Sequence, residues 1–100
     1  MTNNIYISRT HLPPLVEYNK YLKRIWKTHW LTNHGELVRE LEEKLEKRFK
    51  VKNVVCVSNG TSAIMLALRA MEIKEEIYVS PNNFIATVEA PVWMGIKVKF

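Results

Sequence analysis

The feature that most constrains this fold is a short apolar run that leads directly into a helical pattern. Residues 54–57 read Val-Val-Cys-Val, residues 58–62 read Ser-Asn-Gly-Thr-Ser, and a stretch rich in alanine and leucine follows as far as Met71. Gly60 allows the backbone to turn tightly where a side chain would clash. The sequence therefore predicts a strand over 54–57 that passes through a turn into a helix over 61–71.

The same alternation continues to residue 100. The pattern predicts a strand over 76–79, a helix over 84–94 that contains Pro91 and ends at Gly95, and a strand over 96–100. An order of strand, helix, strand, helix and strand is typical of an α/β fold with parallel strands. Strands this apolar are expected to be covered on both faces. Because the last predicted strand runs to residue 100, we expect the chain to be the first part of a larger domain.

The first half of the chain is predicted to be helical. Apolar side chains recur at helical spacing over 15–27 and over 36–50, and a polar loop joins the two stretches. A short extended segment, Ile5-Tyr6-Ile7, precedes them. We therefore divide the chain into an N-terminal helical segment, 1–52, and the first strands and helices of a sheet, 53–100.

Charge and hydropathy exclude several classes of protein. The net charge is +5, but the basic residues form no arginine-rich stripe with interleaved aromatics, so we expect no nucleic-acid partner. A mild positive field suits a phosphate or another anionic ligand. No apolar run reaches the roughly 18 residues of a membrane span, and the N-terminus lacks the features of a signal peptide. We expect a cytoplasmic protein with no membrane partner.

Cysteine and histidine suggest no further chemistry. A single cysteine, Cys56, cannot form an internal disulfide and suits a reducing compartment, where we interpret it as a small buried hydrophobe rather than a catalytic thiol. His11, His29 and His34 show no metal-ligand spacing, so we expect no metal site. No Ser-His-Asp arrangement can be argued from the sequence.

The turn at 58–62 admits two interpretations. The unpaired amides of Gly60, Thr61 and Ser62 would bind a phosphate at the positive end of the helix dipole. Alternatively, a Ser or Thr side chain simply caps the helix. The turn lacks the Gly-Lys-Ser/Thr of a Walker loop and the three glycines of a dinucleotide fingerprint.

Aromatic residues in two loops are further candidates. Ligands of open α/β sheets lie beyond the carboxyl ends of the strands, so the ring of Phe84 would lie near a phosphate held at Thr61, unless it fills the core. The segment Trp30-Leu31-Thr32-Asn33-His34-Gly35 suits a sugar or a nucleotide, because it combines an aromatic face with polar groups. The alternative is a helix connection whose tryptophan is plugged into the core.

Taken together, these pieces resemble the N-terminal part of DegT-type sugar-nucleotide aminotransferases, which are fold-type-I enzymes that use pyridoxal phosphate. The resemblance covers nearly the whole chain and rests on the order and spacing of short motifs. These are Leu12-Pro13-Pro14, Ile25-Trp26, Trp30-Leu31-Thr32-Asn33, Gly35, Leu41-Glu42, Ser58-Asn59-Gly60-Thr61-Ser62-Ala63, Ser80-Pro81, Phe84-Ile85-Ala86-Thr87, Trp93 and Gly95.

The resemblance implies a fold, a cofactor and site residues. The fold is the N-terminal, truncated portion of the three-layer αβα large domain of a fold-type-I transferase. Gly60, Thr61 and Ser62 match the turn that holds the cofactor phosphate, and Phe84 matches the aromatic position stacked on the pyridine ring. Trp30, Thr32 and Asn33 match a loop near the substrate and the dimer interface.

The resemblance also implies an activity. Such enzymes form homodimers and transfer an amino group from an amino acid, commonly glutamate, to C4 of a nucleotide-linked 4-keto-6-deoxyhexose. Their products serve the biosynthesis of cell-surface polysaccharides and related glycans.

The family's catalytic lysine and the aspartate that pairs with the pyridine nitrogen lie further along than residue 100. Lys97 and Lys99 do not match the lysine motif. We therefore expect no catalytic residue in this chain and no activity from the chain by itself. Two alternatives stay open: a non-enzymatic module that binds a phosphorylated ligand or a partner subunit, and a small domain with a structural role only.

Overall fold

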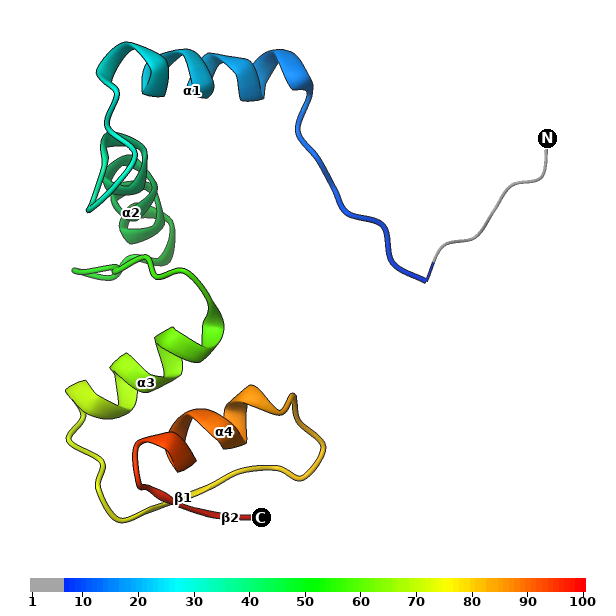
Figure 1. The fold of residues 1–100 in the computed structure, drawn as a ribbon, viewed down its shortest axis with the longest axis vertical. Helices are drawn as coiled ribbons and strands as arrows, with labels where there is room; N and C mark the ends of the chain where they lie inside the picture. Colours follow the sequence, from blue (N-terminus) through cyan, green and yellow to red (C-terminus); the bar gives the residue numbers. More distant parts are fainter. Residues whose placement is uncertain (1–6) are drawn as a thin grey trace. The chain divides into compact units, whose positions relative to one another are not determined.

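The computed structural model describes residues 7–100, which fall into two compact units, Met1–Val54 and Val55–Phe100 (Figure 1). Each unit is described by itself. Of the predicted lead-in Ile5-Tyr6-Ile7, the first two residues lie outside the described residues. None of the helices in the described part of the chain is both long and apolar enough to span a membrane.

The first unit contains the two predicted helices. Helix α1 spans Leu15–Thr28 and helix α2 spans Glu36–Phe49, within one residue of the predicted bounds. Pro14 precedes α1 with φ −54°, as suits a residue at a helix start, and α1 ends at His29 in the left-handed conformation. Glu36 lies in the first turn of α2 and Lys47 in the last, where each charge complements the helix dipole.

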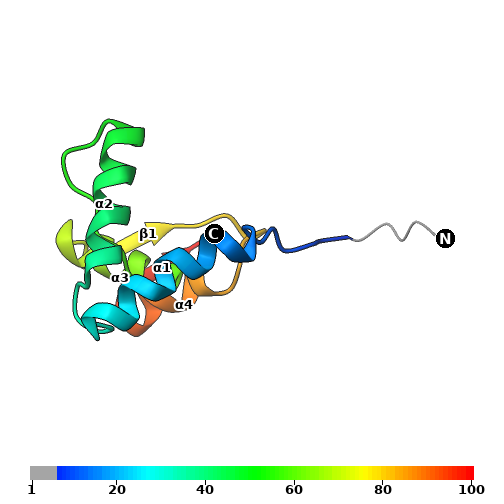
Figure 2. The ribbon, with the colours of Figure 1, turned by 90° about the horizontal axis from the view of Figure 1, so that it is seen from above.

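The apolar faces of these helices have little cover. None of the residues of α1 is buried, and Leu15 and Trp26 are each 69% exposed. In α2 the buried residue is Glu42 rather than one of the leucines. Figures 1 and 2 show that α1 and α2 do not run parallel to each other.

The second unit contains two helices and two strands. Helix α3 spans Gly60–Ala70, strand β1 spans Glu76–Tyr78, helix α4 spans Ala86–Trp93 and strand β2 spans Lys97–Lys99. The strands pair in parallel, with Ile77 opposite Val98, so α4 is the crossover helix of a βαβ unit. Helix α3 packs against α4, and α4 packs against β2. The predicted parallel α/β arrangement over 76–100 is confirmed.

The core of this unit is small. It consists of Leu68 from α3, Ala90 and Pro91 from α4, and Ile96 just before β2. Pro91 lies inside α4 rather than ending it, and its carbonyl accepts hydrogen bonds from the amides of Met94 and Ile96. These bonds turn the chain from the end of α4 into β2.

Three predictions about the second unit are wrong. No strand forms over 54–57, because a strand needs a hydrogen-bonded neighbour and the sheet of the described residues consists of β1 and β2 alone. The strands are not covered on both faces, since Tyr78 of β1 is 73% exposed. Helix α4 begins at Ala86 rather than at residue 84, so Phe84 lies in the preceding loop.

Candidate functional site

The N-terminus of α3 is capped by Asn59. Its backbone is extended, with φ −163° and ψ 169°, and its side-chain Oδ1 accepts a hydrogen bond from the amide of Ser62 at 2.9 Å. Its carbonyl accepts from the amide of Ala63 at 3.2 Å. The cap is therefore an asparagine, and not the Ser or Thr side chain considered from the sequence. Asparagine three residues before Ser62 is a strong capping signal that the sequence analysis missed.

The capping leaves two amides of the turn available. The amides of Gly60 and Thr61 donate a hydrogen bond to none of the residues that the structure describes. The hydroxyls of Thr61 and Ser62 belong to the same turn. A Cβ built on Gly60 would meet nothing within 4 Å, so the space beside this turn is open. Amide and hydroxyl donors at the positive end of a helix dipole fit an anion.

Phe84 lies in the loop between β1 and α4 and is 75% exposed, so it is not a core residue. Asn83 shapes this loop. Its Oδ1 accepts from the amide of Phe84 at 2.8 Å and from Oγ1 of Thr87 at 3.1 Å. The aromatic ring is therefore presented outward just before the first turn of α4.

The turn at 60–62 and the loop of Phe84 lie at the same end of the second unit. In Figure 1, α3 and α4 both run from right to left, whereas β1 and β2 run from left to right. The N-termini of both helices therefore lie at the carboxyl ends of the strands. This is the edge at which open α/β sheets bind their ligands.

The loop after α1 belongs to the first unit. Trp30 is 46% exposed, so it is not a buried core residue. Its indole Nε1 donates a hydrogen bond to the carbonyl of Thr32 at 2.6 Å. The guanidinium of Arg39 lies 5.1 Å from the centre of a Trp30 ring. Thr32 and Asn33 are exposed, and Asn33 has a φ of 54°. A hollow of about 140 Å³ lies among Trp30, Thr32, Asn33 and the ends of the two helices.

The predicted site residues thus form two groups. Gly60, Thr61, Ser62 and Phe84 lie at one end of the second unit, and Trp30, Thr32 and Asn33 lie in one loop of the first. The sequence analysis did not identify Arg39 beside Trp30 or Asn83 beside Phe84. Cys56 is half-buried rather than buried as predicted.

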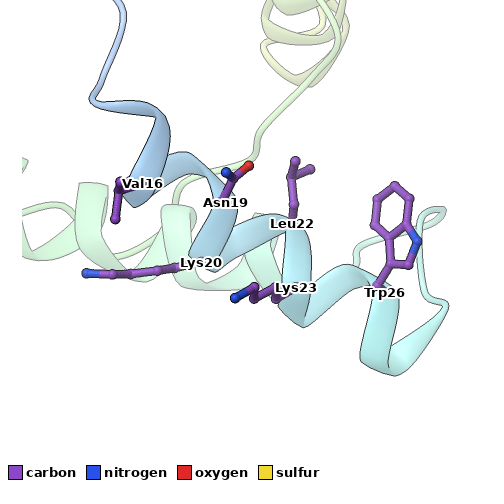
Figure 3. Close-up of a pocket in the computed structure, with 6 residues that line it drawn as sticks. All are labelled: Val16, Asn19, Lys20, Leu22, Lys23 and Trp26. Carbon is purple, nitrogen blue, oxygen red and sulfur yellow. The ribbon is translucent and has the colours of Figure 1, made fainter.

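A broader hollow, of about 610 Å³, contains none of the predicted site residues. It runs along the exposed side of α1 and is lined by Val16, Asn19, Lys20, Leu22, Lys23 and Trp26 (Figure 3). All of these residues belong to one helix, so the hollow is the flank of an exposed helix and not an enclosed site. Among residues 7–100, His, Cys, Asp and Glu form no cluster of three or more that could hold a metal ion.

A parallel βαβ unit with helix N-termini at the carboxyl ends of its strands is typical of the class of α/β proteins whose ligand site lies at this edge of the sheet. Residues 16–100 match the model of the DegT/DnrJ/EryC1/StrS aminotransferase family. The chain therefore belongs to this family, as the resemblance implied, and enzymes of this family in general depend on pyridoxal phosphate.

Individual relatives agree with this assignment. The chain is 40% identical over 96 residues to a dTDP-4-amino-4,6-dideoxy-D-glucose transaminase of Escherichia coli, an alignment that covers 96% of this chain and 26% of the relative. It is 35% identical over 100 residues to the enzyme of the same name from Shigella dysenteriae, covering 100% of this chain and 27% of the relative. The chain thus spans about a quarter of the length of these relatives.

A solved structure supports the fold. The crystal structure of DesI in the presence of its TDP-sugar product matches this chain with a TM-score of 0.80 and 30% identity, over 87% of this chain and 22% of DesI. The predicted fold class is confirmed: the chain has the α/β fold of the N-terminal part of a fold-type-I pyridoxal-phosphate-dependent transferase.

Proposed function

We propose that this chain supplies two parts of the binding site of a sugar-nucleotide aminotransferase. One is the turn of Gly60, Thr61 and Ser62 that binds the cofactor phosphate, called the phosphate seat below. The other is the substrate loop that contains Trp30, Thr32 and Asn33. The complete enzyme would transfer an amino group from an amino acid, with glutamate the expected donor, to a nucleotide-linked 4-keto-6-deoxyhexose. The names of the two transaminase relatives support this substrate class. As the resemblance implies, the complete enzyme would be a homodimer that serves polysaccharide biosynthesis, and the single cysteine favours a cytoplasmic location.

One observation carries the proposal. The N-terminus of α3, where the amides of Gly60 and Thr61 are unpaired among the described residues, lies at the same end of the second unit as the loop before α4, which contains the exposed Phe84. The two amides and the hydroxyls of Thr61 and Ser62 would bind the phosphate of pyridoxal phosphate, and Phe84 would stack on its ring. When bound, the cofactor supplies an electron sink for amino-group transfer.

Trp30, Thr32 and Asn33 would contact the nucleotide-linked sugar. Trp30 offers an aromatic face that is already held by the hydrogen bond to Thr32 and by the neighbouring Arg39 guanidinium. Exposed hydroxyl and amide groups at Thr32 and Asn33 suit the hydroxyls of a sugar.

The chain would bind and orient the cofactor and the sugar substrate but would not catalyse the amino-group transfer. Covalent catalysis on this cofactor needs a lysine amine free to attack, and Lys99 is engaged by Glu76, with Nζ–Oε2 at 2.7 Å. Lys97 is an exposed residue of β2, on the strand rather than in a loop at its carboxyl end. Neither lysine is proposed to act.

The phosphate seat can be tested by removing one amide without disturbing the helix. Gly60→Pro deletes the amide at the first position of α3, where proline is tolerated, and the extended backbone of Asn59 is compatible with a following proline. Gly60→Ala is the matched control, because it keeps the amide and its Cβ enters open space. Each variant is titrated with inorganic phosphate, pyridoxal phosphate and pyridoxal, and amide shifts are followed by NMR.

We expect phosphate and pyridoxal phosphate to shift the NMR resonances of the backbone amides at positions 60 and 61 in the wild-type and Gly60→Ala chains. Gly60→Pro should lower the affinity for both roughly tenfold, the loss of one charge-assisted hydrogen bond. Equal binding by the two variants would refute the seat. If phosphate and pyridoxal phosphate bind equally tightly, the pyridine ring adds nothing, and a general phosphate-binding module becomes the better description.

A further inference from the structure

Arg24 of α1 reaches across to two carboxylates of α2. Its Nε donates to Glu36 Oε1 at 3.1 Å, its Nη2 bonds the same oxygen, and its Nη1 lies 2.7 Å from Glu40 Oε2. The carboxylates of Glu36 and then Glu40 raise the pKa of the Arg24 guanidinium through these bonds. A planar guanidinium suits this double contact, because it presents several donors in a fixed geometry.

The ion pairs close the loop that contains Trp30. Glu36 is the first residue of α2, and Gly35 before it is the last residue of the loop. At the other end, Thr28 Oγ1 donates to the carbonyl of Arg24 at 3.3 Å and accepts from the amide of Trp30 at 3.4 Å. Arg24 is therefore bonded to residues at both ends of the loop.

This loop needs external support. Within the loop, Asn33 and His34 have φ values of 54° and 62°, in the left-handed region; asparagine tolerates this region, but it costs a residue such as histidine about 1–2 kcal/mol. None of the residues of α1 is buried, so a packed core does not hold α1 against α2. Arg24, Glu36 and Glu40 are 37%, 45% and 30% exposed, and partly exposed ion pairs of this kind are screened by salt.

We infer that Arg24 is a positioning residue that stabilises the conformation of the Trp30–Gly35 loop through its ion pairs with Glu36 and Glu40. We also infer that high salt weakens these ion pairs and so loosens the loop. Glu40 is held from its other side by Lys44, with Nζ–Oε1 at 2.6 Å, so its carboxylate is already oriented toward Arg24. The inference concerns the conformation of this loop alone. It does not depend on whether the loop binds a sugar or on the phosphate seat at Gly60.

The test is amide hydrogen exchange of the loop, together with the indole N–H resonance of Trp30, in the 100-residue chain. The wild-type chain is compared at about 0.01 M salt, where the Debye length is about 30 Å, and at about 1 M, where it is about 3 Å. Amides of α3 in the other unit serve as the internal reference. The variants are Arg24→Gln and the control Lys20→Gln, which removes the same charge and breaks the exposed Lys20–Glu17 pair on the same helix.

We expect high salt to speed exchange in the loop roughly two- to fivefold relative to α3. At low salt, Arg24→Gln should speed it by the same factor and shift the Trp30 indole resonance. It should also reduce the salt dependence to that of the charged contacts that remain, Arg39 beside Trp30 and His34 Nδ1 at 3.5 Å from Glu42 Oε2. Lys20→Gln should do none of these. A loop indifferent to salt in the wild-type chain overturns the inference, even if Arg24→Gln fails to fold. An equal response to Lys20→Gln also overturns it.

Discussion

Oδ1 of Asn59 accepts a hydrogen bond from the backbone amide of Ser62 at 2.9 Å. The side chain of the residue just before α3 therefore caps the first turn of this helix. This bond satisfies one of the orphan amides of the helix, whereas those of Gly60 and Thr61 donate to none of the residues that the structure describes. The cap and the proposed phosphate seat therefore share one turn but use different donors.

Replacing Asn59 separates the two roles. Asn59→Ala should destabilise α3 by about 1 kcal/mol, which amide exchange of Ser62 would report as roughly fivefold faster. Asn59→Asp should preserve the cap, because aspartate caps as well as asparagine, but its charge should weaken phosphate binding. Unchanged exchange in Asn59→Ala would contradict the structure of the turn, and unchanged phosphate affinity in Asn59→Asp would count against the seat.

Truncating Phe84 should affect ligand binding and not folding. Its side chain is 75% exposed, so Phe84→Ala should change the free energy of unfolding by less than about 0.5 kcal/mol. The affinity of the Phe84→Ala chain for pyridoxal phosphate should fall roughly two- to tenfold, which is the range of one aromatic stacking contact, while its affinity for inorganic phosphate should not change. Phe100→Ala is the matched control, since Phe100 is 73% exposed in the same unit. A similar loss in both variants would exclude a specific role for Phe84.

The carboxyl of Glu40 should titrate at an unusually low pH. Its hydrogen bond with Lys44, followed by that with Arg24, lowers its pKa below the ordinary 4.5. The contribution of this carboxylate to stability is therefore fully present above pH 4.5 and is lost as the pH falls through the lower folded pKa. In an NMR titration of the Glu40 carboxyl, Lys44→Gln and Arg24→Gln should each raise its pKa toward the ordinary value. No change in either variant would contradict the network.

Pyridoxal phosphate should not react with one lysine of this chain in preference to the others. Reduction of the mixture with borohydride followed by peptide mapping should find adducts spread thinly over several lysines. The reason is that the resemblance leads us to expect no catalytic lysine among these residues, and Lys99 is paired with Glu76. A single lysine modified to stoichiometry would show that the chain carries a nucleophile of its own.

The helices were predictable because their signals are local. Pro14 and Gly35 mark the starts of α1 and α2, and the predicted ends at residues 27 and 50 lie within one residue of the observed ends, Thr28 and Phe49. The turn into α3 was also visible at Gly60, but the predicted reason was wrong, because a Cβ there would meet nothing within 4 Å and no clash requires a glycine. Its cap was assigned to the wrong residue type, since Ser, Thr and Asn compete for that role within a few residues.

Interactions between distant residues were not predictable. Arg24 and Glu36 are twelve positions apart on different helices, and no periodicity links them. The strand predicted over 54–57 has the right composition, but a strand also needs a neighbour, which composition does not supply. Exposure of Phe84 depends on where α4 begins, and Asn83 influences that start through its bonds to Phe84 and Thr87.

The amino-acid sequence by itself determined where this protein forms helices and where its chain turns. These features depend on backbone preferences and on contacts within about four residues along the chain. The tertiary structure alone decided that β1 pairs with β2, that the N-termini of α3 and α4 share one end of their unit, and that Arg24 closes the Trp30 loop. Each of these joins residues far apart in the chain, so it depends on packing and charge in three dimensions.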